Sequence, residues 1–140
     1  MKKKVFLVTG GTGFIGSNIS KFLLEKGYKI KIFDNNYRGG FSKIKKIKKK
    51  LKFIKGDIRD KKLLMKATKN TDAVIHLAYI NGTKYFYTKP ILILDIAIKG
   101  IINVIEACIK NKVKELYLAS SSEVYQTPVK IPTDEKEVLK

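Results

Sequence analysis

The sequence predicts an α/β protein whose parallel sheet is doubly wound, with helices on both faces. Five short apolar runs alternate along the chain with segments of helical periodicity, which is the order of repeated βαβ units. The 140 residues are 44% hydrophobic and 30% charged, a balance typical of one folded domain, expected here to span residues 1–140. In such a sheet, ligands bind at the carboxyl ends of the strands.

The first βαβ unit is predicted from three consecutive patterns. KVFLVT (residues 4–9) is a continuous apolar run, as in a strand buried on both faces. Residues 13–26 repeat apolar side chains at helical spacing, and Gly27 is a helix-stop signal. YKIKIFD (28–34) then alternates apolar and polar residues with period two, which indicates the second strand.

The middle of the chain continues the same alternation. SKIKKIKKKLK (42–52) places apolar residues at helical spacing and predicts an amphipathic helix with a solvated lysine face. LKFIKGD (51–57) indicates the third strand, RDKKLLMKATKN (59–70) a helix, and DAVIHLA (72–78) the fourth strand.

A long helix and a fifth strand complete the predicted sheet. Residues 88–111 carry isoleucine and leucine on nearly every face, and VKELYLASS (113–121) indicates the strand. A helix that is apolar all round needs cover on both sides. One side can meet the sheet; the other predicts a homodimer partner or cover by carboxyl-terminal residues absent from this chain.

The net charge of +18 raises the question of a nucleic-acid or membrane-surface partner. Arg38 and Arg59 are the only arginines, so 28 of the 30 basic residues are lysines, whereas base and phosphate recognition favours the arginine fork. The lysines also occur in nearly every segment. We therefore favour a general compositional bias over nucleic-acid binding.

Other function classes are disfavoured by what the chain contains. Charged and polar residues interrupt the apolar stretch 91–109, so no membrane span is expected, and no targeting segment is evident. Cys108 lies in an apolar run, where a buried side chain is a better interpretation than a reactive thiol. His76 is the sole histidine, and no metal site can be assembled around it. The expected location is the cytoplasm.

The stretch LVTGGTGFIGSNI places Gly10, Gly13 and Gly16 between the first strand and the first helix. In that context the spacing is moderately specific for dinucleotide binding. Gly10 would permit a tight turn, Gly13 would let a pyrophosphate approach the backbone, and Gly16 would let the helix pack closely on the sheet. An ordinary glycine-rich turn is the competing interpretation.

Asp34 ends the second strand, 21 residues after Gly13, where a Rossmann unit carries the acidic residue that holds the adenosine ribose. Its charge would repel the 2′-phosphate of NADP, so the predicted cofactor is NAD. Arg38 is close enough in sequence to accommodate such a phosphate, and Asp34 could also be only a turn-forming residue.

Four motifs together resemble the extended short-chain dehydrogenase/reductase family, the NAD-dependent nucleotide-sugar epimerases, dehydratases and decarboxylases. They occur in the family's order and cover essentially the whole chain: VTGGTGFIG (8–16), GDIRD (56–60), VIHLA (74–78) and ASSSEVY (119–125). The resemblance implies a Rossmann-type sheet and a nucleotide-sugar substrate. In similar enzymes, subunits pair through the long helix, here 88–111.

The resemblance also assigns the cofactor contacts. Asp57 and Ile58 would line the adenine site, although Asp57 could instead only cap the following helix. Leu77, Ala78 and Tyr79 would pass beneath the ribose and nicotinamide end. The full predicted set is Gly10, Gly13, Phe14, Ile15, Gly16, Asp34, Asn35, Asp57, Ile58, Leu77, Ala78 and Tyr79.

For catalysis, the resemblance implies a transient oxidation of the substrate. In it a tyrosine, assisted by a lysine four residues later, takes the proton of a sugar hydroxyl. Ser121 matches the Ser/Thr that hydrogen-bonds the reacting oxygen. Ser122 and Glu123 occupy the positions where the dehydratases have Asp and Glu. Because Ser122 replaces the Asp, dehydration is disfavoured, and the Ser-Glu pair is more similar to that of the decarboxylases and some epimerases. A polar strand end with a solvated Glu123 is the alternative.

The Tyr-x-x-x-Lys pair should follow Ser121 by about two dozen residues, but no tyrosine follows Tyr125. We therefore expect the chain to resemble the amino-terminal portion of a longer enzyme, or the product of a truncated reading frame. Whether it is an enzyme by itself stays open. The second hypothesis is a catalytically inactive module that binds NAD.

Overall fold

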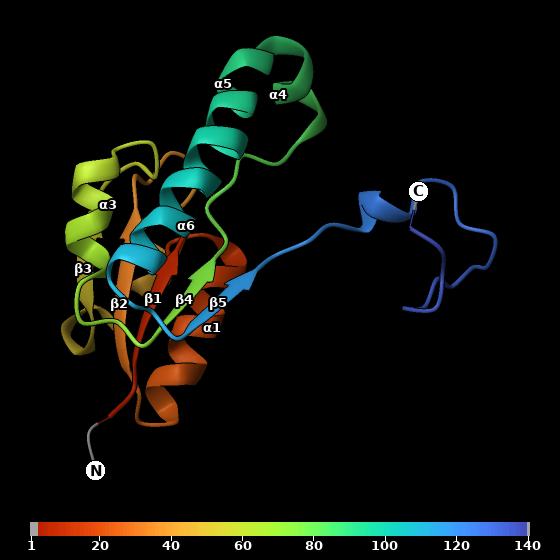
Figure 1. Cartoon of the computed structure of the whole chain (residues 1–140). Helices are drawn as coiled ribbons and strands as arrows, with labels where there is room; N and C mark the ends of the chain where they lie inside the picture. The colour runs from red at the N-terminus through yellow and green to blue at the C-terminus, as the bar shows by residue number, and fades with distance from the viewer. Residues whose placement is uncertain (1–2, 140) are drawn as a thin grey trace.

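The computed structural model describes residues 3–139 and shows one parallel sheet with helices on both faces (Figure 1). The strand order is β3-β2-β1-β4-β5, the first five strands of a Rossmann sheet. The strands are β1 (Val5–Thr9), β2 (Lys29–Asp34), β3 (Lys52–Lys55), β4 (Ala73–His76) and β5 (Glu115–Leu118). The predicted fold class is confirmed.

The register places the strand ends that matter for ligand binding side by side. Thr9 at the end of β1 lies opposite Phe33 of β2 and His76 of β4. Asp34, the last residue of β2, lies opposite Lys55 of β3. The chain leaves β1 between β2 and β4, the point where strand order reverses, so a crevice opens there at the carboxyl edge.

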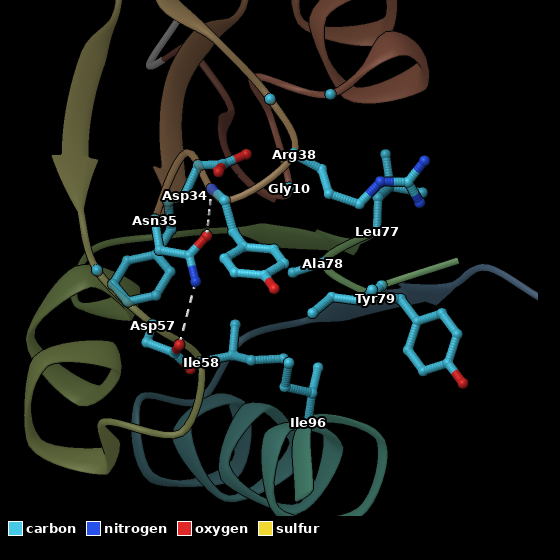
Figure 2. A pocket seen from close by; sticks show the side chains of 16 residues that line it. Gly10, Asp34, Asn35, Arg38, Asp57, Ile58, Leu77, Ala78, Tyr79 and Ile96 are labelled. Carbon is cyan, nitrogen blue, oxygen red and sulfur yellow. Dashed lines mark hydrogen bonds between the residues drawn. The ribbon is translucent and has the colours of Figure 1, made fainter. Parts of the chain in front are cut away.

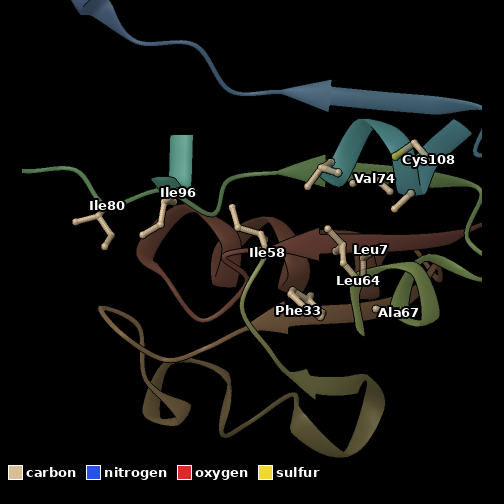
Figure 3. Packing of buried hydrophobic residues seen from close by; sticks show 11 residues of the cluster. Leu7, Phe33, Ile58, Leu64, Ala67, Val74, Ile80, Ile96 and Cys108 are labelled. Carbon is tan, nitrogen blue, oxygen red and sulfur yellow. The ribbon is translucent and has the colours of Figure 1, made fainter. Parts of the chain in front are cut away.

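Each face of the sheet packs against its own helices. On one face, α1 (Phe14–Glu25) brings Leu23 and Leu24 against Val8 and Ile32. On the other face, Leu7 and Phe33 meet side chains from α3 (Lys61–Thr68) and α6 (Ile101–Lys110), as Figure 3 shows. Cys108 of α6 is part of this second core, as predicted for a buried side chain.

The prediction of one helix over residues 42–52 is wrong. The structure has only a single-turn helix, α2 (Phe41–Ile44), and a 3-10 turn, η1 (Lys48–Lys50). Lys52 pairs with Lys31 at the start of β3, so a helix continuing to this point would pull β3 off the edge of β2. Ile44 is fully buried and provides the anchor that the apolar spacing indicated.

The long helix begins at residue 90, two residues later than predicted, and is preceded by a short helix that was not predicted. That short helix is α4 (Thr83–Thr88). The long helix starts with α5 (Pro90–Asp95), widens into a π-helical turn, η2 (Ile96–Gly100), and continues as α6. Proline suits the first helical position because its missing N–H has no helical partner there.

The last described part of the chain leaves the sheet. After β5 comes a 3-10 turn, η3 (Ser122–Tyr125), and the segment through residue 139 projects away from the body of the molecule (Figure 1). Among residues 3–139, no helix has both the length and the apolar character needed to cross a bilayer.

Candidate functional site

The glycine loop after β1 is shaped by close backbone contacts. Gly10 has φ +69°, a left-handed conformation, and a side chain there would meet the backbone carbonyl of Leu77 at 2.8 Å. At Gly13 a Cβ would meet only the Gly10 oxygen, at 3.1 Å. At Gly16 it would meet that same oxygen at 2.3 Å. Gly10 and Gly16 therefore serve packing, while Gly13 leaves its outer side open.

Gly13 lies at the start of α1. Gly13 is the N-cap, and the first helical hydrogen bond runs from the Ser17 amide to the Gly13 oxygen at 3.1 Å. The amides of Phe14, Ile15 and Gly16 therefore have no carbonyl partner within the helix. Free N–H groups and the helix dipole make this end attractive to a phosphate.

Asp34 fastens the glycine loop to the end of β2. Its buried carboxylate accepts hydrogen bonds from the Thr12 amide at 2.9 Å and from the Asn36 amide at 2.7 Å. Asp34 is thus more than a turn former, because it holds two loops together. Each carboxylate oxygen retains a second acceptor position for a ligand hydroxyl.

Asp57 lies beyond the end of β3 and is bound by its neighbours. Arg59 donates to both of its carboxylate oxygens, and Asn35 Nδ2 donates to Oδ2 at 3.1 Å. The hydrogen bonds from Arg59 are the main reason that the pKa of Asp57 falls to about 2. The helix cap after this loop is Asp60, which accepts from the Leu63 amide, so the capping alternative for Asp57 does not hold.

The opposite wall is held by a hydroxyl at the end of β1. Thr9 Oγ1 accepts from the amides of Leu77 and Ala78 at 3.1 and 3.2 Å, and it lies 2.7 Å from His76 Nδ1. With two acceptor positions used, the hydroxyl hydrogen is available to Nδ1, which requires a neutral imidazole. Burial lowers the pKa of His76 to about 4, which agrees with that protonation state.

These pieces enclose a pocket at the carboxyl edge of the sheet (Figure 2). Nine of the twelve predicted cofactor residues line it; Phe14, Ile15 and Gly16 do not. The lining residues are Gly10, Gly13, Phe33, Asp34, Asn35, Tyr37, Arg38, Gly39, Gly56, Asp57, Ile58, Leu77, Ala78, Tyr79, Ile80 and Ile96. The structure therefore brings together residues from four strand ends that are far apart in sequence.

The three predicted catalytic residues lie elsewhere. Ser121, Ser122 and Glu123 are exposed, follow β5, and are not among the residues that line the pocket. Ser121 caps η3, and its Oγ accepts from the Glu123 amide at 3.3 Å. Among the hydrogen bonds observed in residues 3–139, none joins these three residues to a residue that lines the pocket.

Sequence reasoning missed how the rim of the pocket is built. Arg38 reaches across to donate to the Asn81 carbonyl, and its guanidinium lies 5.9 Å from the centre of the Tyr85 ring. Lys89 Nζ donates to the Tyr37 hydroxyl at 3.0 Å. These contacts join the loop after β2 to α4 and to the residues on either side of it. No spacing rule could reveal them, because their partners lie 43 to 52 residues apart.

The pocket residues fit a dinucleotide. Phosphates would find free amides beside Gly13, a ribose would find carboxylate acceptors at Asp34, and a purine would lie between Ile58 and the polar Asn35–Asp57 pair. Among residues 3–139 no group of three or more His, Cys, Asp or Glu side chains could hold a metal ion. The chemistry offered here is recognition of phosphates, hydroxyls and a base.

Comparisons with known proteins point to one family. The model of the NAD dependent epimerase/dehydratase family matches residues 6–140. A UDP-N-acetyl-alpha-D-glucosaminuronate decarboxylase of Bacillus cytotoxicus is 36% identical over 88% of this chain and 38% of its own length. A putative UDP-glucose 4-epimerase of Methanocaldococcus jannaschii is 38% identical over 94% of this chain and 43% of its own.

Solved structures give the same result. The UDP-glucose 4-epimerase of Bifidobacterium longum, solved with NAD+ and UDP, superposes with a TM-score of 0.88 at 31% identity, over 98% of this chain and 43% of that one. The chain thus spans about two fifths of the length of the relatives it matches. With its family model matched over nearly the whole sequence, the chain belongs to the NAD dependent epimerase/dehydratase family.

Proposed function

We propose that this chain binds NAD at the carboxyl edge of its sheet and forms the cofactor-binding portion of a nucleotide-sugar epimerase or decarboxylase. The observation that supports this most directly is Gly13. Its outer side is open, it caps the helix whose first amides are free, and it lines the pocket with Asp34 and Asp57. A pyrophosphate requires such an approach to the backbone.

The cofactor would lie across the strand ends in the order of its parts. The adenine would sit at Asp57 and Ile58, its ribose at Asp34 and Asn35, and the pyrophosphate over Gly10, Gly13 and the amides of Phe14, Ile15 and Gly16. Leu77, Ala78 and Tyr79 would lie under the second ribose and the nicotinamide. NAD is favoured over NADP because the Asp34 carboxylate, which accepts from the Thr12 amide, would repel a 2′-phosphate on the ribose.

Bound NAD supplies the hydride acceptor for oxidation of a sugar hydroxyl. In the proposed enzyme, Ser121 would hydrogen-bond the reacting oxygen, and Ser122 and Glu123 would face a nucleotide-sugar substrate. The relatives of this chain are named as UDP-sugar epimerases and decarboxylases, which supports that substrate class. For this reaction, Ser121 and the residues of η3 would have to lie closer to the pocket than they do in this structure.

The alternative is an NAD-binding module without turnover. It is favoured by one observation: Ser121, Ser122 and Glu123 are exposed and do not line the pocket. Both versions of the proposal require the same cofactor site. Binding is therefore tested before activity.

Calorimetric titration of NAD and NADP into the chain and into Gly13→Ala tests the proposal. The new methyl group would meet one atom, the Gly10 oxygen at 3.1 Å, a tight contact that a shift of a few tenths of an ångström relieves, and it would stand where the pyrophosphate must approach. We expect NAD to bind more tightly than NADP, and Gly13→Ala to weaken NAD by more than about tenfold, or 1.4 kcal/mol.

Gly40→Ala is the matched control. Gly40 has extended backbone, its added Cβ would lie 3.7 Å from Ser42 Oγ, and it does not line the pocket, so NAD affinity should be unchanged. Absence of NAD binding by the original chain, or equal binding by Gly13→Ala, would refute the proposed site. Tighter binding of NADP would refute the role of Asp34.

A further inference from the structure

The carboxylate of Asp57 has every acceptor position filled. A carboxylate offers about four lone-pair sites. The Arg59 amide and Nε donate to Oδ1, both at 2.9 Å, the Arg59 terminal NH2 donates to Oδ2 at 2.8 Å, and Asn35 Nδ2 donates to Oδ2 at 3.1 Å. Three of these four donors therefore belong to one residue, Arg59.

The fourth donor differs from the other three. Asn35 is exposed, its hydrogen bond to Asp57 is the longest of the four, and it lines the pocket beside Asp57 (Figure 2). Arg59 does not line the pocket. The Asn35 amide is thus the donor that a ligand can replace, whereas the donors of Arg59 stay in place behind the carboxylate.

Arg59 is itself anchored on the long helix. Its remaining terminal nitrogen donates to Asp95 of α5 at 3.0 Å, and Lys99 of η2 pairs with the same carboxylate at 2.5 Å. The Arg59 guanidinium therefore bridges two carboxylates, one at the adenine end of the pocket and one on the helix. Fixed in this way, it cannot follow Asp57 if that side chain turns, so it sets the direction of the carboxylate.

Two more contacts hold the same loop on the same helix. Asn103 Nδ2 donates to the carbonyls of Ile58 and Arg59 at 3.0 and 3.1 Å. Gly100 lies directly beneath Ile58, where a Cβ would meet the Ile58 side chain at 2.3 Å. The π-helical turn that contains Gly100 also places Ile96 in the pocket lining. The helix and the adenine end are one packed unit.

We propose that Arg59, anchored by Asp95, is a positioning residue for adenine recognition: it occupies three acceptor sites of Asp57 and leaves one, held by Asn35 in this structure, for the exocyclic amino group of adenine. This inference rests on the proposed NAD site. It assigns selectivity for the base to an arginine that does not touch the ligand and to a helix residue 36 positions away.

The distinguishing measurement compares NAD with nicotinamide hypoxanthine dinucleotide, in which a carbonyl replaces the amino group of adenine. The unchanged chain should prefer NAD by about tenfold, since the carbonyl oxygen would face a charged acceptor. Arg59→Gln should weaken NAD about fivefold or more and bring the preference close to one. A residue needed only for folding would lower both affinities and leave their ratio unchanged.

Three further variants make the assignment specific. Asp95→Asn should move the ratio in the same direction by a smaller factor, and Arg59→Gln/Asp95→Asn should be no worse than Arg59→Gln alone, because both act through one bridge. Lys61→Gln is the control, since the Lys61–Glu106 ion pair joins α3 to α6 at 2.7 Å without touching Asp57. Its ratio should equal that of the original chain.

Arg59→Lys keeps the positive charge but lacks the forked guanidinium group, and it replaces Arg59→Gln if that variant fails to fold. Its preference for NAD should fall between those of the original chain and Arg59→Gln. An undiminished, tenfold preference in Arg59→Gln or in Arg59→Lys, or additive effects of Arg59 and Asp95, would overturn the inference while leaving NAD binding intact. No binding of either dinucleotide by the original chain would overturn the proposed function, and this inference with it.

Discussion

At the scale of single residues, the site depends on side chains that hold two or more backbone or side-chain groups at once. Thr9 accepts from two amides and donates to His76, and Asp34 joins the Thr12 and Asn36 amides. Such groups tolerate little change, because removing one partner leaves a buried polar atom unsatisfied, at a cost of about 1–3 kcal/mol. His76 is the one whose protonation can be changed by the solvent.

The stability of the protein should therefore fall between pH 6.5 and pH 4. Burial lowers the pKa of His76 from 6.5 to about 4, so the unfolded chain binds the extra proton first as the pH drops. The stabilisation is complete above pH 6.5 and is lost as the pH approaches 4. Urea unfolding at pH 7 and pH 5 should differ by about 1–2 kcal/mol for this group.

His76→Gln removes that titration and serves as the comparison. Its stability is lower throughout, but the loss between pH 7 and pH 5 should shrink. Asp57 does not interfere in this window, because its pKa of about 2 places its own contribution at lower pH. An equal pH dependence in both proteins would show that His76 is not held neutral.

Residues of the site could be predicted from the sequence only where their partners are close in the chain or where a family motif contains them. Gly10, Gly13 and Asp34 were predicted from spacing, because the loop and the second strand that they serve are adjacent in the chain. Asp57 and Ala78 came from family motifs. Arg59 and Asp95 carried no signal, since an ion pair across 36 residues follows only from packing α5 beside the loop after β3.

At the scale of elements, the sequence predicted the strands well and the helices less well. Apolar runs mark strands because a parallel sheet buries both faces. Lysine-rich residues 42–52 have helical spacing, yet the need to return to the edge of β2 limits them to α2 and η1. The π-helical turn, in which Gly100 packs under Ile58, follows from no spacing of residues in the sequence.

The outer face of the long helix carries the next prediction. A stripe of apolar side chains remains exposed at helical spacing: Ile91, Leu94, Ile98, Ile102, Ile105 and Ile109. We propose that this face pairs with a second copy of the chain. A continuous apolar stripe of this length is rarely left exposed on a soluble monomer, and pairing two copies would remove it from water.

Ile102→Lys should weaken that pairing by placing a cation in the centre of the stripe. Size-exclusion chromatography with light scattering at tens of micromolar should give a dimer for the original chain and a monomer for the variant. Phe22→Lys on α1, also at an exposed apolar residue, is the matched control and should remain dimeric. A clean monomer of the original chain would contradict the proposed interface.

At the scale of the whole molecule, the proposed cofactor site exists only when the whole sheet is folded. The pocket takes residues from the ends of β1, β2, β3 and β4 and from the long helix, so no part of it survives separate unfolding of the sheet. A ligand that binds only this assembled edge must stabilise the whole fold by mass action. The size of that effect follows from affinity alone.

NAD at 100 times its dissociation constant should add about 2.7 kcal/mol to the free energy of unfolding and raise the melting temperature by roughly 10 °C. Differential scanning fluorimetry over a range of NAD concentrations measures this shift. Gly13→Ala should show at most about half of it, because a tenfold weaker affinity leaves about 1.4 kcal/mol at the same NAD concentration. A logarithmic rise with NAD concentration indicates binding to the folded sheet. A shift of equal size in Gly13→Ala would place the ligand elsewhere, because the only change in that variant is a methyl group at the proposed pyrophosphate position.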